Sequence, residues 1–140
     1  LAAPQVEVSQ VVIVVRLGDD EESRQEYGDQ AGVLYTLINP ELVRVSDEMV
    51  DGIEACLSIP GYYGNVSRHE AVTVQALDRN GKKVRIKAKG WLARVFQHEI
   101  DHLDGILYID RATEIWRATD EEAAEAIAAD EEASEAEAAE

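Results

Sequence analysis

The chain has 140 residues, of which 46% are apolar, and this length fits a single domain with one core. Its formal net charge of −16 argues against a nucleic-acid-binding protein, because phosphate recognition needs basic patches. No apolar run approaches the roughly 18 residues of a membrane helix, so the sequence predicts no membrane contact. The single cysteine, Cys56, excludes an internal disulfide and indicates a reducing compartment.

The first 40 residues predict two strands joined by a long loop. Residues 11–15 (VVIVV) form an apolar run of the length of a buried strand. Residues 17–32 are polar and interrupted by glycines, which predicts an exposed loop. Residues 33–40 (VLYTLINP) predict a second strand, and the dipeptide Asn39-Pro40 is expected to end it.

The middle of the chain predicts a short strand and a hairpin. Residues 53–61 (IEACLSIPG) indicate a strand that runs into a Ser-Ile-Pro-Gly turn. Apolar side chains alternate within residues 69–78, which predicts a further strand. The dipeptide Asn80-Gly81 follows as a strong two-residue turn signal, so this strand and the segment KKVRIKAKG are expected to form a β-hairpin.

Residues 90–103 predict an α-helix. Four side chains lie on one helical face because they are spaced by 4, 3 and 4 residues: Trp91, Val95, His98 and His102. Gly105 is placed to end this helix, and residues 106–110 (ILYID) are expected to form a short strand or a docked extended segment.

Residues 118–140 form an acidic tail with ten of the 29 acids and none of the 13 bases, so residues 1–117 carry a net charge of only −6. The Ala/Glu-rich composition favours helix but offers almost nothing to bury. We therefore expect a solvated, frayed or disordered tail, with an acidic contact surface for a partner as the alternative.

The segment QHEIDHLDG, residues 97–105, contains the most specific chemical pattern. His98 and His102 are four residues apart, lie one above the other on a helix and can hold one metal ion. Glu99 can meet a water on that metal without ligating it, and so can act as a base. The same pattern also arises by chance as the polar face of an amphipathic helix.

A catalytic site of this type needs a third protein ligand and an open fourth position. No histidine follows His102, and His69 is expected to be a surface residue at the start of a strand. Cys56 is one candidate ligand, although a lone cysteine is commonly a small buried hydrophobe. Downstream carboxylates are the other candidates: Asp104, Asp110 and Glu114.

Three ordered segments, LAAPQ, EACLSIPG and QHEIDHLDG, resemble the signature motifs of peptide deformylases. The stretches ALDRNGKKVRIKAKG and GWLARVFQHEIDHLDGILYID are similar to the hairpin and catalytic helix of that family. The resemblance covers residues 1–115 and implies an α+β fold with antiparallel strands packed around a central HExxH metal-binding helix. It implies a deformylase-like catalytic domain over residues 1–117 that lacks the family's N-terminal region.

The resemblance also implies an activity and its partners. A metal-dependent hydrolase would remove the N-formyl group from the N-terminal methionine of newly made proteins and release formate. The partners would be N-formylmethionyl peptides and nascent chains at the ribosome, without direct nucleic-acid or membrane contact. The compartment would be a bacterial-type cytoplasm, with an organelle as the alternative.

The resemblance assigns roles residue by residue. Cys56, His98 and His102 would hold one divalent metal ion, with Fe²⁺ expected first and Zn²⁺ or Ni²⁺ as alternatives. Glu99 would be the general base and acid. The Gln5 side-chain amide and the Leu57 backbone N–H would bind the oxyanion. The substrate pocket would be lined by three residues of the helix: Trp91, Arg94 and Val95.

Charged residues around the ligands are expected to brace the site. Glu54 and Arg68 flank the cysteine segment and are expected to pair, and Asp101 is expected to accept a hydrogen bond from a ligand or to brace a nearby loop. Ala55 stands where the family has glycine, which would cost on the order of 1 kcal/mol if the backbone φ there were positive.

Two rival functions remain at this point. A zincin-type metallopeptidase would use a His or Glu as the third ligand and would leave Cys56 away from the metal. A truncated, catalytically impaired deformylase-like protein would act as a scaffold through its acidic tail. Intact Glu99 and Gln5 argue against the second rival.

Overall fold

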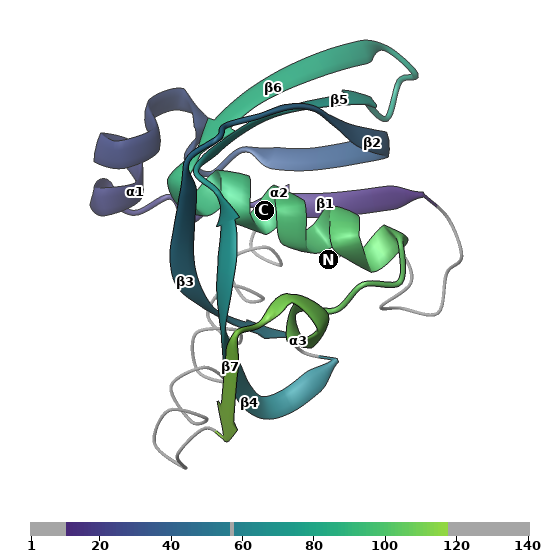
Figure 1. Ribbon diagram of the computed structural model, residues 1–140. Coiled ribbons are helices and arrows are strands. Elements are labelled where there is room, and N and C mark those ends of the chain that lie inside the picture. Colours follow the sequence, from purple (N-terminus) through teal and green to yellow (C-terminus); the bar gives the residue numbers. More distant parts are fainter. Residues whose placement is uncertain (1–10, 57, 118–140) are drawn as a thin grey trace.

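The computed structural model describes residues 11–56 and 58–117 of the chain. Two antiparallel sheets enclose the long helix α2, with strand orders β1-β2-β5-β6 and β3-β4-β7 (Figure 1). This arrangement confirms the predicted α+β fold with antiparallel strands around the helix that carries the HExxH sequence. The elements in chain order are β1 (Val12–Arg16), α1 (Glu21–Tyr27), the 3-10 helix η2 (Gly28–Gln30), β2 (Leu34–Val45), β3 (Met49–Cys56), β4 (Ile59–His69), β5 (Ala71–Leu77), β6 (Lys83–Lys89), α2 (Gly90–Leu103), α3 (Tyr108–Arg111) and β7 (Glu114–Arg117).

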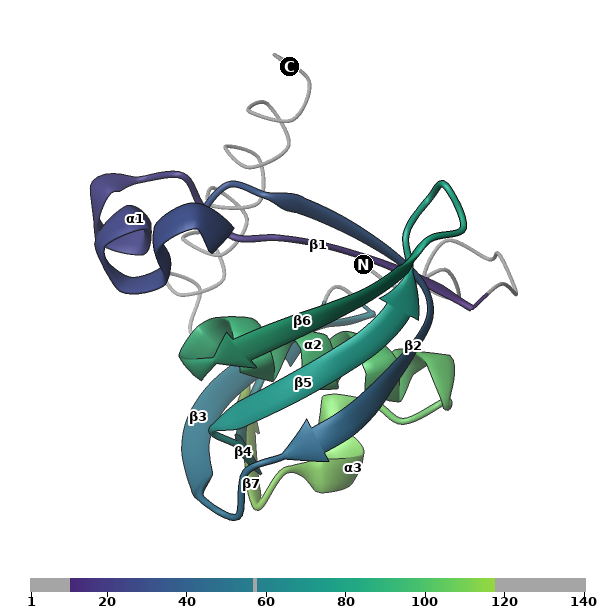
Figure 2. The ribbon, with the colours of Figure 1, turned by 90° about the horizontal axis from the view of Figure 1, so that it is seen from above.

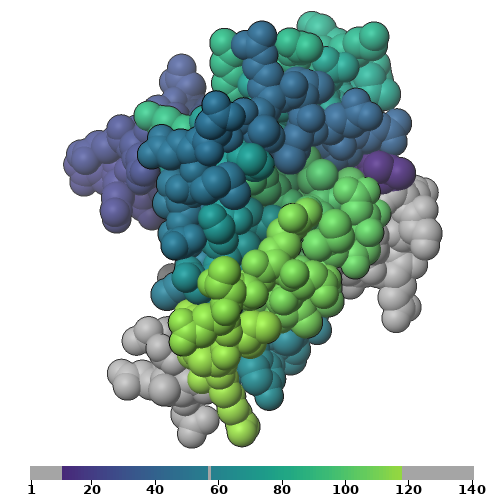
Figure 3. All heavy atoms as spheres, in the orientation of Figure 1, coloured from purple at the N-terminus to yellow at the C-terminus, as the bar shows by residue number. Residues whose placement is uncertain are grey.

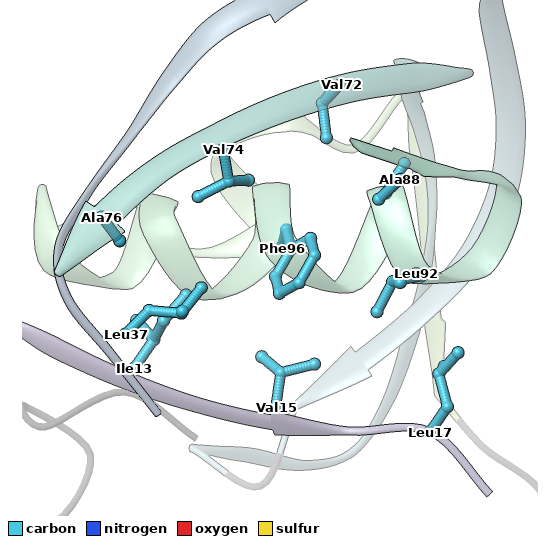
Figure 4. Packing of buried hydrophobic residues seen from close by; sticks show 11 residues of the cluster. Ile13, Val15, Leu17, Leu37, Val72, Val74, Ala76, Ala88, Leu92 and Phe96 are labelled. Carbon is cyan, nitrogen blue, oxygen red and sulfur yellow. The ribbon is translucent and has the colours of Figure 1, made fainter. Parts of the chain in front are cut away.

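The hydrophobic core lies between the four-stranded sheet and one face of α2. Seen from above, β2, β5 and β6 lie over the helix (Figure 2). Phe96 is fully buried at the centre of this layer, and the Tyr35 ring meets it edge to face at a centroid distance of 5.6 Å. Strand residues, one residue after β1 and the first turn of α2 supply the rest of the cluster: Ile13, Val15, Leu17, Leu37, Val72, Val74, Ala76, Ala88, Leu92 and Ala93 (Figure 4). One face of α2 is therefore anchored, and its opposite face is turned towards β3 and β4.

The expectation of a loop over residues 17–32 is wrong, because this segment contains α1 and η2. Asp20 caps α1, since its Oδ1 accepts the N–H of Ser23 at 2.7 Å, and two glutamates in the first turn suit the positive end of the helix dipole. The N–H of Trp91 donates to the Tyr27 hydroxyl at 2.7 Å, which ties the end of α1 to the start of α2.

Two predicted boundaries also differ from the structure. Asn39-Pro40 does not end the second strand, because β2 continues to Val45 through a register shift between Ile38 and Glu41, where Asn39 has a φ of 52°. Such a bulge accommodates a proline that cannot donate to the ladder.

Within residues 106–110, which the sequence predicts to be extended, residues 108–110 instead begin the helix α3. The Asp110 carboxylate accepts the N–H of Leu107 at 2.9 Å and so caps this short helix locally. Asp110 is thereby engaged with the backbone of its own helix.

The hairpin and the long helix are confirmed. β5 and β6 pair antiparallel, although the connection spans residues 78–82 and places Gly81 at a φ of 80°. The predicted helix over residues 90–103 coincides with α2, and Gly105 follows it with a φ of 75°. Of the helices within the described residues, none is long and apolar enough to cross a membrane.

Candidate metal centre

Three potential ligand atoms converge where the end of β3 meets the second half of α2. The Cys56 Sγ lies 3.4 Å from the His102 Nε2, and the Nε2 atoms of His98 and His102 are 3.1 Å apart. All three donors lie within 4.8 Å of one another. The structure thus brings together the three residues that the sequence nominated as metal ligands.

This convergence follows from matched repeats in a strand and a helix. Every second residue of β3 faces α2, and two strand residues advance by about 6.6 Å. Every fourth residue of α2 faces β3, and four helical residues advance by about 6 Å. The near-equal steps set three residues of β3 against three of α2 in the same order: Gly52 by Arg94, Glu54 by His98, and Cys56 by His102.

Glu54 orients the His98 ring. The His98 Nδ1 lies 2.8 Å from the Glu54 Oε1, and because a carboxylate only accepts, Nδ1 must carry the hydrogen. The other ring nitrogen, Nε2, then faces Cys56 and His102. The Tyr108 ring lies nearly parallel to the His98 ring, with an interplanar angle of 18° and a centroid distance of 6.3 Å. A carboxylate behind a ligating imidazole is the usual support of a metal-binding histidine.

The electrostatics of the cluster favour a cation. Burial alone would raise the pKa of the Cys56 thiol, but hydrogen bonds with His102 and His98 lower it to about 5. Burial likewise disfavours charged His98, yet Cys56, Glu54 and the nearby charge of Glu99 raise its pKa to about 9. A thiolate and two imidazoles, with a buried carboxylate behind one of them, therefore fit a divalent metal ion.

A buried ion network extends from Glu54 to α3. The Arg68 guanidinium holds both Glu54 oxygens at 2.9 Å, which confirms the predicted pair, and its Nη1 reaches the Asp101 Oδ2 at 2.5 Å. Asp101 also accepts two bonds from Arg111, at 2.6 and 3.0 Å, and so braces the helix α3 rather than a loop or a ligand. Burial would raise the pKa of Glu54, but Arg68, His98 and Arg94 lower it to about 2.

Glu99 lies in α2 beside His98 and is only 8% exposed. Its charge contributes to the raised pKa of His98, so the carboxylate is electrostatically coupled to the ligand cluster. The two predicted oxyanion donors, Gln5 and Leu57, lie outside the described residues, as does the acidic tail over residues 118–140.

The three predicted pocket residues have different surroundings. Trp91 is 53% exposed and Arg94 is buried, and both line a hollow of about 160 Å³ with residues of β3 and β4. Val95 is partly buried against the hydrophobic core and does not line this hollow. A larger hollow of about 470 Å³ runs along β2, β5 and β6 and contains none of the predicted site residues.

Two features of the site differ from expectation. His69 is not an exposed residue at a strand start, because it ends β4, is partly buried and places its Nδ1 2.7 Å from the Ser46 carbonyl oxygen. Among the described residues, Asn39 is the one non-glycine residue with a positive φ, so Ala55 carries no penalty of that kind.

Sequence reasoning missed the anchoring role of Gln97. Its amide pairs with both backbone groups of His69, at 3.0 and 2.9 Å, and so fixes the end of β4 to α2. The only signal was its place one residue before His98.

Figure 3 shows the yellow-green atoms of α3 and β7 forming a continuous surface with the green atoms of α2.

Comparisons with known proteins agree with this geometry. The sequence model of the family described as "Polypeptide deformylase" matches residues 1–118. A peptide deformylase of Symbiobacterium thermophilum is 56% identical over 115 residues, which make up 82% of this chain and 48% of the relative. A peptide deformylase of Thermomicrobium roseum is 58% identical over 111 residues, or 79% of this chain and 60% of the relative. The chain thus spans about half to three fifths of these relatives.

A solved structure is also similar in fold and sequence. It is a class I type b peptide deformylase from Acinetobacter baumannii with Met-Ala-Ser bound, and its TM-score against this chain is 0.69 at 40% sequence identity. The matched region covers 79% of this chain and 68% of that protein.

Proposed function

Because this chain belongs to the polypeptide deformylase family, we propose that it carries the centre of a hydrolase that removes the formyl group from N-terminal formylmethionine. The convergence of Cys56 with His98 and His102 carries the proposal. A cysteine thiolate as the third ligand distinguishes this donor set from that of a zincin-type peptidase, whose third ligand is a His or Glu.

The proposed cofactor is one divalent metal ion held by these three side chains. We favour Fe²⁺, because a soft thiolate with two imidazoles suits it, and the same ligands also accept Zn²⁺ or Ni²⁺. When bound, the ion supplies Lewis acidity that polarises a carbonyl and makes water more acidic.

The chain's own residues would move the protons and hold the charge. Glu99 would take a proton from the attacking water, whose oxygen bonds to the formyl carbon, and would deliver it to the leaving nitrogen as the C–N bond breaks. Formate and a free N-terminal amine result. Gln5 and the backbone N–H of Leu57 would stabilise the oxyanion, each donor contributing about 3 kcal/mol to transition-state binding.

The proposed substrates are N-formylmethionyl peptides, including nascent chains at the ribosome, and the proposed compartment is the cytoplasm. The methionine-led peptide bound to the Acinetobacter baumannii relative supports this substrate class. We propose that Trp91, Arg94 and Val95 contribute to the wall of the side-chain pocket, although they do not share one hollow.

Formate release from formyl-Met-Ala-Ser tests the proposal. The chain loaded with Fe²⁺ or Ni²⁺ is expected to release formate, and Glu99→Ala is expected to lose this activity without losing the metal. No formate from the loaded wild-type chain would refute the function.

A second comparison separates this function from the zincin alternative. Cys56→Ser is expected to weaken metal binding strongly, because it removes the thiolate. Glu114→Ala removes an exposed carboxylate that a zincin reading would allow as a ligand, and it is expected to bind metal normally. The reverse pattern would favour the peptidase.

A further inference from the structure

Arg94 lies on the face of α2 that carries His98, one helical turn before it, and is only 7% exposed. Its guanidinium makes three hydrogen bonds. Nη1 donates to the Glu54 Oε2 at 2.7 Å and to the Val66 carbonyl oxygen at 2.9 Å, and Nη2 donates to the Val50 carbonyl oxygen at 2.6 Å. Arg94 therefore fixes α2 to the backbones of β3 and β4 and to the carboxylate behind His98.

Gly52 provides the space in which this guanidinium sits. A Cβ built on Gly52 would lie 2.7 Å from the Arg94 Cζ and 2.8 Å from its Nε, which is closer than such atoms can approach. Gly52 is not among the glycines with a positive φ, so its backbone conformation does not require glycine. The missing side chain at this position instead allows the guanidinium to approach the strand.

The Glu54 carboxylate is held from two sides. Oε1 faces the His98 Nδ1 at 2.8 Å, and Oε2 faces the Arg94 Nη1, while Arg68 binds both oxygens. Arg94 and Arg68 are both buried and balance the two buried carboxylates Glu54 and Asp101. Loss of Arg94 would remove one of the two donors to Oε2 and leave Arg68 alone to hold the carboxylate, which could then turn more freely relative to His98.

We propose that Arg94 is a positioning residue that fixes Glu54, and through it the His98 ring, in the orientation in which the His98 Nε2 joins Cys56 and His102. The inference rests on the proposed function, since it concerns the ligand cluster of that site. It differs from the role of Arg94 as a pocket wall, because a wall residue would change substrate KM and leave metal affinity unaltered.

Cobalt affinity of the full 140-residue chain tests this role without an activity assay. Co²⁺ binding is measured by competition with a coloured chelator, and the visible spectrum reports on thiolate and imidazole ligation. Arg94→Met and Gly52→Ala are each expected to weaken Co²⁺ binding about tenfold, the lower end of the usual effect of residues behind metal ligands. Arg94→Lys, which keeps the charge, is expected to recover part of the affinity.

A double variant makes the test specific. Methionine at position 94 has no guanidinium for a new Cβ to displace, so Gly52→Ala combined with Arg94→Met is expected to bind Co²⁺ no more weakly than Arg94→Met alone. Arg111→Met is the matched control, because it removes a guanidinium from the far end of the same network. We expect it to lower thermal stability and to leave Co²⁺ affinity near the wild-type value.

Wild-type affinity and spectrum in folded Arg94→Met would overturn the inference. If that variant does not fold, wild-type affinity in Gly52→Ala and Arg94→Lys would overturn it equally. A wild-type chain that binds no Co²⁺ would refute the proposed function and this inference with it. If the wild-type chain binds Co²⁺ and the variants bind it with the same affinity, only the inference about Arg94 is refuted.

Discussion

The most informative single perturbation of this fold is Glu54→Gln. The substitution keeps the shape of the side chain but removes its charge at a site where the residue is 4% exposed. The carboxylate accepts four hydrogen bonds, two from Arg68 and one each from Arg94 and His98. The amide oxygen of glutamine can accept two of these four hydrogen bonds. Its NH₂ group cannot accept a hydrogen bond and would face the remaining N–H donors.

Two routes give a similar magnitude for this loss. Removing one partner of a buried ion pair typically costs about 3 to 5 kcal/mol, because the remaining charge stays buried and uncompensated. The lowering of the Glu54 pKa from 4.5 to about 2 corresponds to about 3 kcal/mol of stability at neutral pH. We therefore expect the free energy of unfolding at pH 7 to fall by about 3 kcal/mol.

Urea unfolding of the metal-free protein, followed by circular dichroism, measures this change. The midpoint should fall while the slope m stays constant, since the surface exposed on unfolding does not change. Asp19→Asn is the matched control, because it makes the same chemical change in an exposed ion pair with Arg24 and should leave the midpoint unaltered. A midpoint for Glu54→Gln equal to that of the control would refute the reasoning.

Three other predictions follow from the same structure. Because the pKa of Glu54 is lowered in the folded state, its contribution to the free energy of unfolding is complete above pH 4.5 and is lost as the pH falls towards about 2. The stability of the wild-type protein should therefore drop across this window more steeply than that of Glu54→Gln. Urea titrations at a series of fixed pH values measure both. Equal slopes for the two proteins would contradict this assignment. Phe96→Ala should destabilise the fold by about 3 to 5 kcal/mol, whereas Ile53→Ala, at a residue that is 58% exposed, should have little effect on the urea midpoint. Chelation of a bound divalent metal should lower the thermal midpoint, since a ligand at 100 times its Kd stabilises the folded state by about 2.7 kcal/mol. This difference between metal-bound and metal-free protein should vanish in Cys56→Ser if that thiolate is a ligand.

The parts of the fold that the sequence predicted correctly are those set by local periodicity. Within residues 90–103, the side chains of one helical face recur every three to four positions, and α2 has the same bounds. The helix α1 was not predicted, because the glycines on either side of it indicate a loop, although Asp20 and the two following glutamates form an N-terminal helix signal. The continuation of β2 past Pro40 could not be predicted, since the bulge depends on pairing with β5.

The sequence could predict the part of the candidate site that its motifs contain, namely the potential metal ligands. The spacing of His98 and His102 indicates a shared metal, but spacing alone leaves the third ligand open between Cys56 and downstream acids, and the family resemblance is what favours Cys56. The roles of Arg94 and Gly52 had no such signal. They depend on which residue of β3 lies beside which turn of α2, and sequence spacing alone does not supply that register.

This register makes the site a property of strand and helix together. Because side chains alternate across a strand, a slip of β3 by one residue would turn Glu54 and Cys56 away from α2 and bring Ala55 towards it. The contacts of Arg94 with the backbones of β3 and β4 oppose such a slip, and the contact on β3 is with Val50, six residues before Cys56. The ligand cluster is therefore held at one end by Arg94 and Gly52, and its geometry depends on packing that lies outside the motif that identifies it.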